Sequence, residues 1–515
     1  MTSYNRRLKR CGEFLRQSAA DPDASSIICV LDALDECRED DRKQLIKWLC
    51  DIRQSLAHHD SKSTIKFLVT SRPYDNVQRW FEPTTLRWPY VRLRGEDEND
   101  QIHREINLVI EQRIRDLTSE FALSNSNTDR LREQLLQMQH RTYLWLYLAI
   151  EEIRGLYQNS FHPNNVVIPT LSSSVEDAYE RILQKIEMQQ KPNARRILLI
   201  IVGARRALTI GEMALALGAA SVHQLDDSTF EAPDERHLKK HIRQWCGLFV
   251  FIQDSKLFLI HQTAKEYLLS KNLHASFDAR NWRSSLTLTE VEVEMANLCT
   301  MYLCMTNTDD EFRTLQEHRS QTQKAGETFF TYCAEYWGSH LQDQDITNDH
   351  NDHRLLKRVL KLYIVSSNLF RSWFFRAWQA YRPWESAPDV LSQHVIAFNG
   401  HTAILAYCYR MYGFDLEARD EDRRTALFWA AERGHESVAE WLLSRGADAN
   451  TRGTRSTVLH TASENGHGKV VQILLDHGAD VNARGTFGTA LHSASIYGHE
   501  KVVQIFRAAR AKVKV

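Results

Sequence analysis

The stretch Thr457-Val-Leu-His-Thr-Ala-Ser-Glu-Asn-Gly-His467 decides the fold of the C-terminal part of this chain, because its pattern recurs at a fixed spacing. Gly-His pairs stand at 434–435, 466–467 and 498–499, which is a period of 32 residues. A period of about 20 to 50 residues marks a solenoid built from one repeated supersecondary unit. We therefore predict that residues 386–515 form a stack of helix pairs.

Each unit of this stack has the same start and stop signals. A Thr opens a short helix, and Gly434 or Gly466 ends it, where a left-handed backbone costs glycine little. A second helix follows and ends at Gly446 or Gly478. A degenerate copy, marked by Gly400-His401, precedes the three regular ones.

The repeat resembles the ankyrin repeat, whose period is about 33 residues and whose first helix opens Thr-Pro-Leu-His. The resemblance implies that the stack binds a partner protein through its concave face and loop tips. We interpret the histidines as structural residues that hydrogen-bond the backbone at turns, and not as metal ligands. The motif residues are Thr425, Leu427, Gly434, His435, Thr457, Leu459, His460, Gly466, His467, Thr489, Leu491, His492, Gly498 and His499.

A second informative stretch, Ile27-Ile-Cys-Val-Leu-Asp-Ala-Leu-Asp-Glu36, is an apolar run that ends in carboxylates. The run predicts a strand buried on both faces of a parallel sheet, with Asp32 at the edge where such sheets bind ligands. Asp32 could hold Mg²⁺ through water, and Asp35 or Glu36 could orient an attacking water. The next predicted strand, 64–69, leads to Arg72, which could contact a γ-phosphate.

These two strands resemble the Walker B and sensor 1 elements of NACHT-type signalling NTPases of the STAND class, and most closely the fungal proteins in which NACHT precedes ankyrin repeats. The resemblance implies nucleotide or Mg²⁺ binding by Asp32 and Arg72. It also implies a switch from a closed monomer to an oligomer, and a role in non-self recognition and cell death.

The family's phosphate-binding loop, Gly-x-x-x-x-Gly-Lys-[Ser/Thr], has no counterpart before Asp32. Met1 to Ser26 holds a single glycine, Gly12, with no such Lys after it. We therefore expect an N-terminally truncated chain that binds no ATP or Mg²⁺ cofactor unless the loop is supplied. It would not be an enzyme, and Asp35 and Glu36 would be vestigial. The alternative is an active NTPase whose loop lies in a segment omitted from this chain.

Residues 173–275 predict a winged helix, with a β-hairpin that turns at Asp254-Ser255. The following His261-Gln-Thr-x-x-Glu resembles the STAND winged-helix motif, whose histidine reaches the β-phosphate of bound ADP. Without a phosphate loop, we favour a structural His261 that hydrogen-bonds a backbone carbonyl. The candidate recognition segment, Ile210–Ala220, has no Lys or Arg, so we expect no nucleic-acid binding.

The whole chain is predicted to be multidomain and mainly α. The net charge is −1, so no global field draws it to nucleic acid or membrane. Its cysteines form no Cys-x-x-Cys pair, which fits reduced thiols in a cytoplasmic protein. We expect a partial NTPase α/β module at 1–95, a helical bundle at 96–172, the winged helix at 173–275, a helical linker at 276–385 and the ankyrin solenoid at 386–515. The expected function is that of a signalling scaffold.

Overall fold

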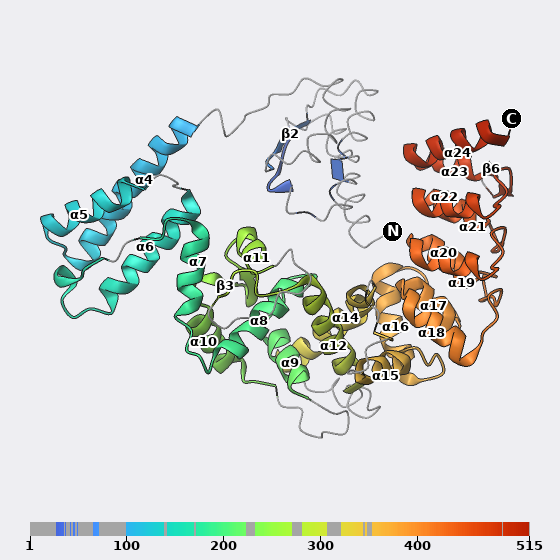
Figure 1. The fold of residues 1–515 in the computed structure, drawn as a ribbon, viewed down its shortest axis with the longest axis horizontal. Helices are drawn as coiled ribbons and strands as arrows, with labels where there is room; N and C mark the ends of the chain where they lie inside the picture. The colour runs from blue at the N-terminus through green and yellow to red at the C-terminus, as the bar shows by residue number, and fades with distance from the viewer. Residues whose placement is uncertain are drawn as a thin grey trace.

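The computed structural model describes most of the chain from Asn99 onward and two strands before it. The described residues are 27–34, 37, 42, 45–46, 49, 65–71, 99–138, 142–168, 171–222, 232–269, 281–305, 321–342, 344, 346–347, 353–486 and 488–513. Figure 1 shows helices predominating over three small two-stranded sheets. The mainly α fold class is thereby confirmed.

The N-terminal sheet pairs β1 (Ile27–Leu31) with β2 (Ile65–Val69) in parallel. One face packs on Leu34, Leu45 and Ile46. On the other face, Ile28, Val30 and Leu68 are 66%, 60% and 53% exposed. The prediction of a strand buried on both faces is therefore wrong for the described residues. A continuous apolar run shows that both faces are apolar, but it does not show that both are covered.

A three-helix bundle follows, with its own core. Ser124 and Thr142 each cap a helix by accepting a hydrogen bond from a backbone N–H in its first turn. Isoleucines at positions 106, 110 and 114 repeat every four residues, which lines them up on one buried face. The bundle helices are α4 (Asn99–Phe121), α5 (Asn125–Leu136) and α6 (Tyr143–Gln158).

The winged helix is confirmed. Its hairpin pairs two antiparallel strands and turns at Asp254 and Ser255, whose φ angles are +48° and +60°. Thr209 forms an isolated antiparallel β-bridge with Lys256, so the chain before α9 pairs with the second strand of the hairpin. The elements are α7 (Val175–Gln184), α8 (Lys191–Gly203), α9 (Ile210–Ser221), α10 (Glu235–Cys246), β3 (Val250–Gln253), β4 (Lys256–Leu259) and α11 (Gln262–Leu268).

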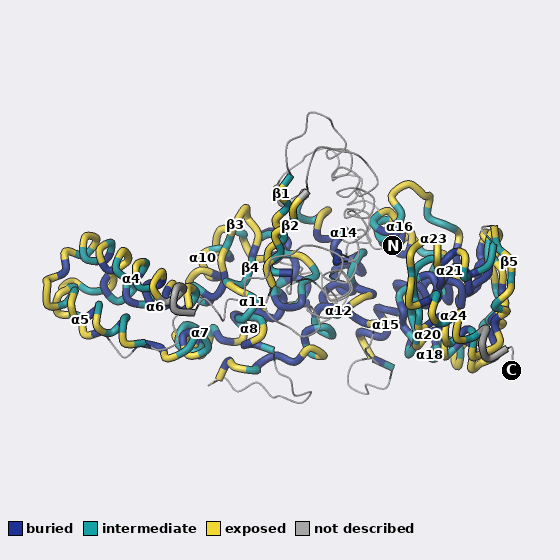
Figure 2. The backbone as a smooth tube through the Cα atoms, turned by 90° about the horizontal axis from the view of Figure 1, so that it is seen from above, coloured by how far each residue is buried: buried dark blue, intermediate teal, exposed yellow. Residues whose placement is uncertain are grey.

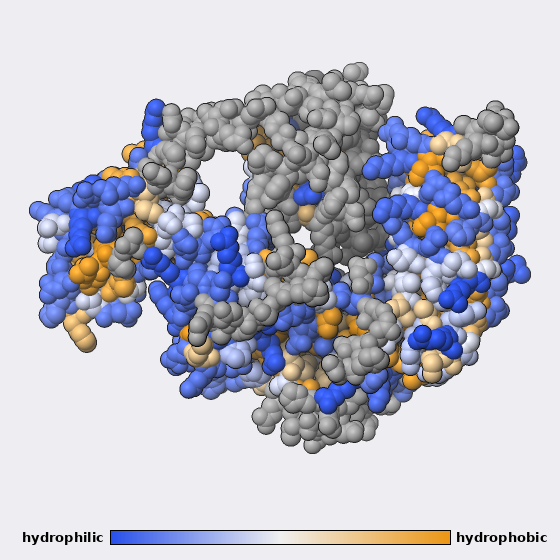
Figure 3. Space-filling view, in the orientation of Figure 1, coloured by the Kyte–Doolittle hydropathy of each residue, from blue (hydrophilic) through white to orange (hydrophobic). Residues whose placement is uncertain are grey.

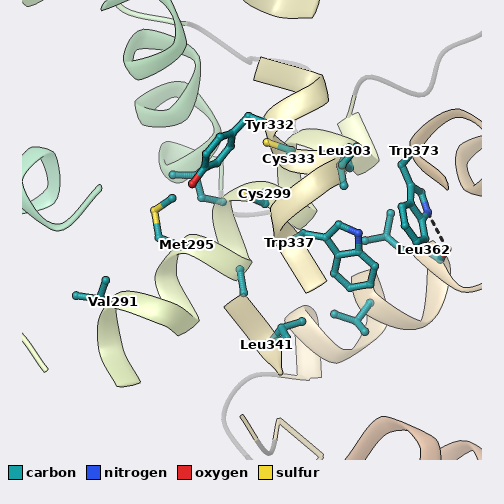
Figure 4. Close-up of a cluster of buried hydrophobic side chains, with 14 of the residues drawn as sticks. Val291, Met295, Cys299, Leu303, Tyr332, Cys333, Trp337, Leu341, Leu362 and Trp373 are labelled. Atoms are coloured by element: carbon teal, nitrogen blue, oxygen red, sulfur yellow. Dashed lines mark hydrogen bonds between the residues drawn. The ribbon is translucent and has the colours of Figure 1, made fainter. Parts of the chain in front are cut away.

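Aromatic-rich helices connect the winged helix to the repeats. In Figure 4, α12 faces α14 across a core that includes Met295, Cys299 and Trp337. The Trp373 indole N–H donates to the carbonyl of Leu362 at 3.0 Å, which fixes one large ring. The helices are α12 (Leu288–Met305), α14 (Gln321–Leu341), α15 (His353–Leu362) and α16 (Asn368–Tyr381).

Four helix pairs form the C-terminal stack, as the repeat predicts. Figure 2 shows buried backbone running from the winged helix into this stack, and one hydrophobic cluster extends from Leu148 to Phe506. Within the described residues, no helix is long and apolar enough to cross a membrane. The pairs are α17 (Ser392–Asn399) with α18 (Thr402–Tyr412), α19 (Ala426–Arg433) with α20 (Glu436–Ser444), α21 (Val458–Glu464) with α22 (Gly468–Asp476), and α23 (Ala490–Ile496) with α24 (Glu500–Val513).

Candidate functional site

A hydrogen bond between the side chains of Thr70 and Asp32 connects the carboxyl ends of β1 and β2. The Thr70 hydroxyl donates to Asp32 Oδ1 at 2.5 Å and accepts from the backbone N–H of Ala33 at 2.8 Å. Asp32 is exposed at this edge, as expected for a residue directly after a strand. Asp35, Glu36 and Arg72 lie outside the described residues, so their predicted roles stay predictions.

Asp32 and Thr70 offer hard oxygen donors, which are the ligands that Mg²⁺ prefers. Two donors are too few to hold it alone, since Mg²⁺ keeps octahedral coordination with waters or phosphates in the other positions. Among the residues described, no group of three His, Cys, Asp or Glu side chains is placed to hold a metal ion. The described donors at this edge fit one corner of a nucleotide-bound Mg²⁺ site.

His261 begins α11, as the motif predicts, and its ring caps that helix. Its Nδ1 accepts a hydrogen bond from the Thr263 backbone N–H at 3.2 Å and lies 2.9 Å from the Thr263 hydroxyl. That hydroxyl also contacts the Tyr179 hydroxyl on α7 at 2.9 Å. The structural interpretation of His261 needs one correction, because the ring bonds a backbone N–H and not a carbonyl. A free N–H at a helix start is the group that needs a partner.

A groove of about 400 Å³ lies beside His261, between the end of α8 and the hairpin. Apolar side chains such as Phe251 and Leu257 form most of its wall. The Arg206 guanidinium at the groove is held by two hydrogen bonds to the buried Glu212 carboxylate, at 2.8 and 2.7 Å. Burial acts to raise the pKa of Glu212, but Arg206 and the Thr209 N–H outweigh it and lower that pKa. The charge of Arg206 is thus neutralised within the fold.

In the ankyrin stack, the histidine of each of the three regular Gly-His pairs forms a hydrogen bond to the preceding repeat. The Nε2–H of His435, His467 and His499 donates to the carbonyls of Phe398, Glu432 and Glu464 at 2.8, 3.2 and 2.9 Å. The structural interpretation of these histidines is confirmed.

Two independent constraints favour glycine in the first three Gly-His pairs, namely the backbone conformation and the space available for a side chain. Gly400, Gly434 and Gly466 have φ angles of +79°, +78° and +75°, which confirms the predicted left-handed helix ends. A Cβ on any of them would lie 2.5–2.6 Å from Nδ1 of the histidine in the next repeat. The spacing of Gly and His is therefore fixed by contact between repeats as well as by local backbone conformation.

Burial keeps these histidines neutral. It lowers the pKa of His401 and His467 to about 4 and that of His435 to about 3. The Tyr363 hydroxyl donates to Nδ1 of His401 at 2.7 Å, which needs an unprotonated nitrogen. The neutral histidines therefore act as buried structural residues that hydrogen-bond to neighbouring elements.

Thr-x-x-His, the second part of the motif, is present in the last two repeats, and in the first of these it links one repeat to the next. The hydroxyls of Thr457 and Thr489 lie 2.7 and 2.8 Å from Nδ1 of His460 and His492. His460 Nε2 then donates to the carbonyl of Gly488, one repeat further, at 3.0 Å. Leu427 and Leu459 are each 1% exposed, while Leu491 in the last described repeat is half-buried.

The loop tips form a polar ladder that sequence reasoning missed. The Asp448 N–H donates to Glu417 at 2.9 Å, and the Asp480 N–H donates to the Asn450 side chain at 2.7 Å. The 32-residue offset from Asp448 to Asp480 was the available signal. Rigid tips of this kind suit a binding surface because little order is lost on association.

The last described repeat departs from its predecessors on one surface. Ile496 and Tyr497 are 67% and 44% exposed, whereas Glu464 and Asn465 occupy the equivalent positions one period earlier. Figure 3 shows apolar side chains among polar ones over α21–α24. Exposed apolar residues at positions that are polar in the two preceding repeats mark a candidate contact surface.

Comparison with known proteins matches successive parts of this chain to family models. They are nephrocystin 3, N-terminal (residues 5–72), a domain of unknown function (102–160), the winged helix domain of GPI inositol-deacylase (179–280) and ankyrin repeats (392–453 and 451–515).

Vegetative incompatibility protein HET-E-1 of Podospora anserina is 25% identical over 250 residues, which are 48% of this chain and 17% of that protein. The alignment thus spans less than a fifth of the relative's length. Together, the matched models and the fold show that this chain combines a NACHT-like N-terminal part, a winged helix and ankyrin repeats.

Proposed function

We propose that this chain is a signalling scaffold related to STAND NTPases, located in the cytoplasm, that binds a protein partner through its ankyrin stack. The observation that carries the proposal is the stack itself, with hydrogen-bonded loop tips and with Ile496 and Tyr497 exposed where the two preceding repeats are polar. Stacked repeats present extended surfaces that bind proteins. Self-association belongs to the same proposal, through the family resemblance.

The partner test uses affinity capture with the 515-residue chain, followed by titration of each purified captured protein. The variant I496E/Y497N restores the side chains of the preceding repeat, and R455E/R484E reverses charge at two exposed tips. We expect each to weaken binding at least tenfold. The matched control, Q472E/K501E, changes exposed residues on α22 and α24 and should leave binding unchanged. Equal affinity for all forms would contradict binding through the stack.

We further propose that the 515-residue chain by itself binds nucleotide poorly and is not an enzyme. The sequence contains no Gly-x-x-x-x-Gly-Lys-[Ser/Thr] motif, and at the sheet edge the described contacts are those of Asp32 and Thr70. Each lost charge-assisted hydrogen bond to phosphate removes about 1.5–3 kcal/mol, so affinity should fall by orders of magnitude. Calorimetric titration with Mg·ATP and Mg·ADP tests this. Micromolar binding of either would contradict it and favour an active NTPase module.

A further inference from the structure

Helix α10 of the winged helix carries a cluster of basic side chains on its solvent face. The helix contains four basic residues, two histidines and a single acidic residue, Glu235. The basic residues are Arg236, Lys239, Lys240 and Arg243. Leu238, Ile242 and Cys246 recur every four residues and are buried. Because one face is fixed in the core, the cations are held on the other. The Arg236 side chain is 94% exposed.

The position of α10 within the winged helix suggests what the basic cluster could bind. The chain runs through α8, α9 and α10 and then enters the β3–β4 hairpin, so α10 is the helix that directly precedes the wing (Figure 1). In helix-turn-helix proteins the second helix of the motif is the one that enters the major groove. By their order before the hairpin, α9 and α10 are the helices that correspond to this pair.

The expectation of no nucleic-acid binding rests on a different helix. The segment Ile210–Ala220, which has no Lys or Arg, lies in α9, and that helix is almost entirely buried. A buried helix cannot contact DNA, whatever its charge. The exposed helix after it is the basic one.

Among the residues whose positions are described, two acidic side chains lie at the start of α10, and neither of them pairs with Lys240 or Arg243. Glu235 is turned toward α9, since its Oε1 lies 2.7 Å from the site of a Cβ built on Gly211. Asp234 caps the helix by accepting from the backbone N–H groups of Arg236 and His237, and it lies 3.9 Å from the Arg236 guanidinium. In the described part of the chain, Lys240 and Arg243 take part in no ion pair.

We propose that α10 is a docking surface for double-stranded nucleic acid, which it contacts through backbone phosphates. Arg236, Lys240 and Arg243 span about 10 Å along one rigid helix at 1.5 Å per residue, and a B-DNA major groove about 12 Å wide accepts such a helix. Lys and Arg contacts to phosphate give affinity without sequence preference.

Charge and burial favour nucleic acid over an anionic membrane. A helix that binds a membrane surface inserts its own apolar face into the lipid. The apolar face of α10 is occupied, because Leu238 is 3% exposed and Ile242 is fully buried in the winged-helix core. Contacts to a phosphate backbone need only the polar face of α10, where Arg236, Lys240 and Arg243 are exposed.

The test is fluorescence anisotropy of a labelled 24-base-pair duplex of mixed sequence, titrated with the 515-residue chain at 50 to 200 mM NaCl. We expect saturable micromolar binding at 50 mM and a log–log salt slope near −3, because each phosphate neutralised contributes about −0.9. The variant R236Q/K240Q/R243Q should weaken binding at least tenfold and flatten the slope by about one per residue. All three side chains are exposed, and circular dichroism should show an unchanged fold.

A matched control removes the same number of exposed cations from α15, in the variant R354Q/K357Q/K361Q. It should bind the duplex within twofold of the wild type. Absence of binding at 50 mM NaCl, or equal losses for the two triple variants, would overturn the proposal. Poly-glutamate that competes as well as unlabelled DNA of equal charge would overturn it in favour of an acidic protein. Binding to phosphatidylserine vesicles but not to the duplex would assign the surface to membrane.

Discussion

At the scale of single residues, two left-handed glycines of one repeat allow the cost of backbone strain to be separated from the cost of a steric clash. Gly434 and Gly446 have φ angles of +78° and +95°, but only Gly434 has a neighbour, His467 Nδ1, within 4 Å of its Cβ position. We expect Gly434→Ala to destabilise the chain by more than Gly446→Ala, which should cost only the left-handed backbone penalty of about 1–2 kcal/mol. Urea unfolding of both variants checks this. Equal losses would mean that the histidine contact contributes nothing.

The buried histidines make stability depend on pH. Burial lowers the pKa of His467 to about 4 and that of His435 to about 3, from 6.5 in the unfolded chain. The unfolded state therefore binds more protons below pH 6.5, and stability falls as pH drops from 6.5 toward 4. Each site contributes roughly 3 kcal/mol to this loss. The variant H435Q cannot titrate and should flatten the dependence. A slope identical to that of the wild type would exclude His435 as a contributor.

At the scale of the element, the inner helices of the stack are held by apolar contact between repeats. Leu459 on α21 is 1% exposed, and α21 packs against α19 and α23. Leu459→Asp should cost several kcal/mol, because it buries an unpaired charge. The control Gln472→Asp, on the exposed side of α22, should cost less than about 1 kcal/mol. Thermal melting distinguishes the two, and similar melting temperatures would contradict the assigned register.

At the scale of the whole molecule, a buried polar cluster joins the aromatic-rich helices to the stack. Glu432 is 3% exposed, accepts from the Arg382 guanidinium and from the Tyr381 hydroxyl at 3.1 Å, and lies 3.8 Å from Arg424. Glu432→Gln removes the buried carboxylate that Arg382 and Arg424 share, although each keeps another carboxylate, and should cost about 1–3 kcal/mol. The matched change Glu385→Gln removes an exposed partner of Arg382 and should cost under about 1 kcal/mol.

The same substitution tests whether the molecule unfolds as one unit. One hydrophobic cluster runs from the winged helix to the repeats, which predicts a single cooperative transition for this part of the chain. We expect Glu432→Gln to split that transition when it is followed by calorimetry. A single sharp transition in the variant would show that apolar contacts alone couple the two parts.

The sequence by itself determined the features that repeat or that depend on near neighbours. The 32-residue period is a repeated signal, whereas the turn at Asp254-Ser255 and the helix start at His261 are local ones, and the structure confirms all three. Turn and cap preferences act within a few residues, so one sequence suffices to find them.

Tertiary structure alone decided what each signal contacts. His435 donates to a carbonyl 37 residues away, and the open face of β1 and the exposed side of α10 depend on which elements cover them. An apolar run or a basic helix has the same sequence whether it is covered or open. Burial is set by segments distant in the chain, and for that reason the sheet and the α10 surface had to be seen in three dimensions.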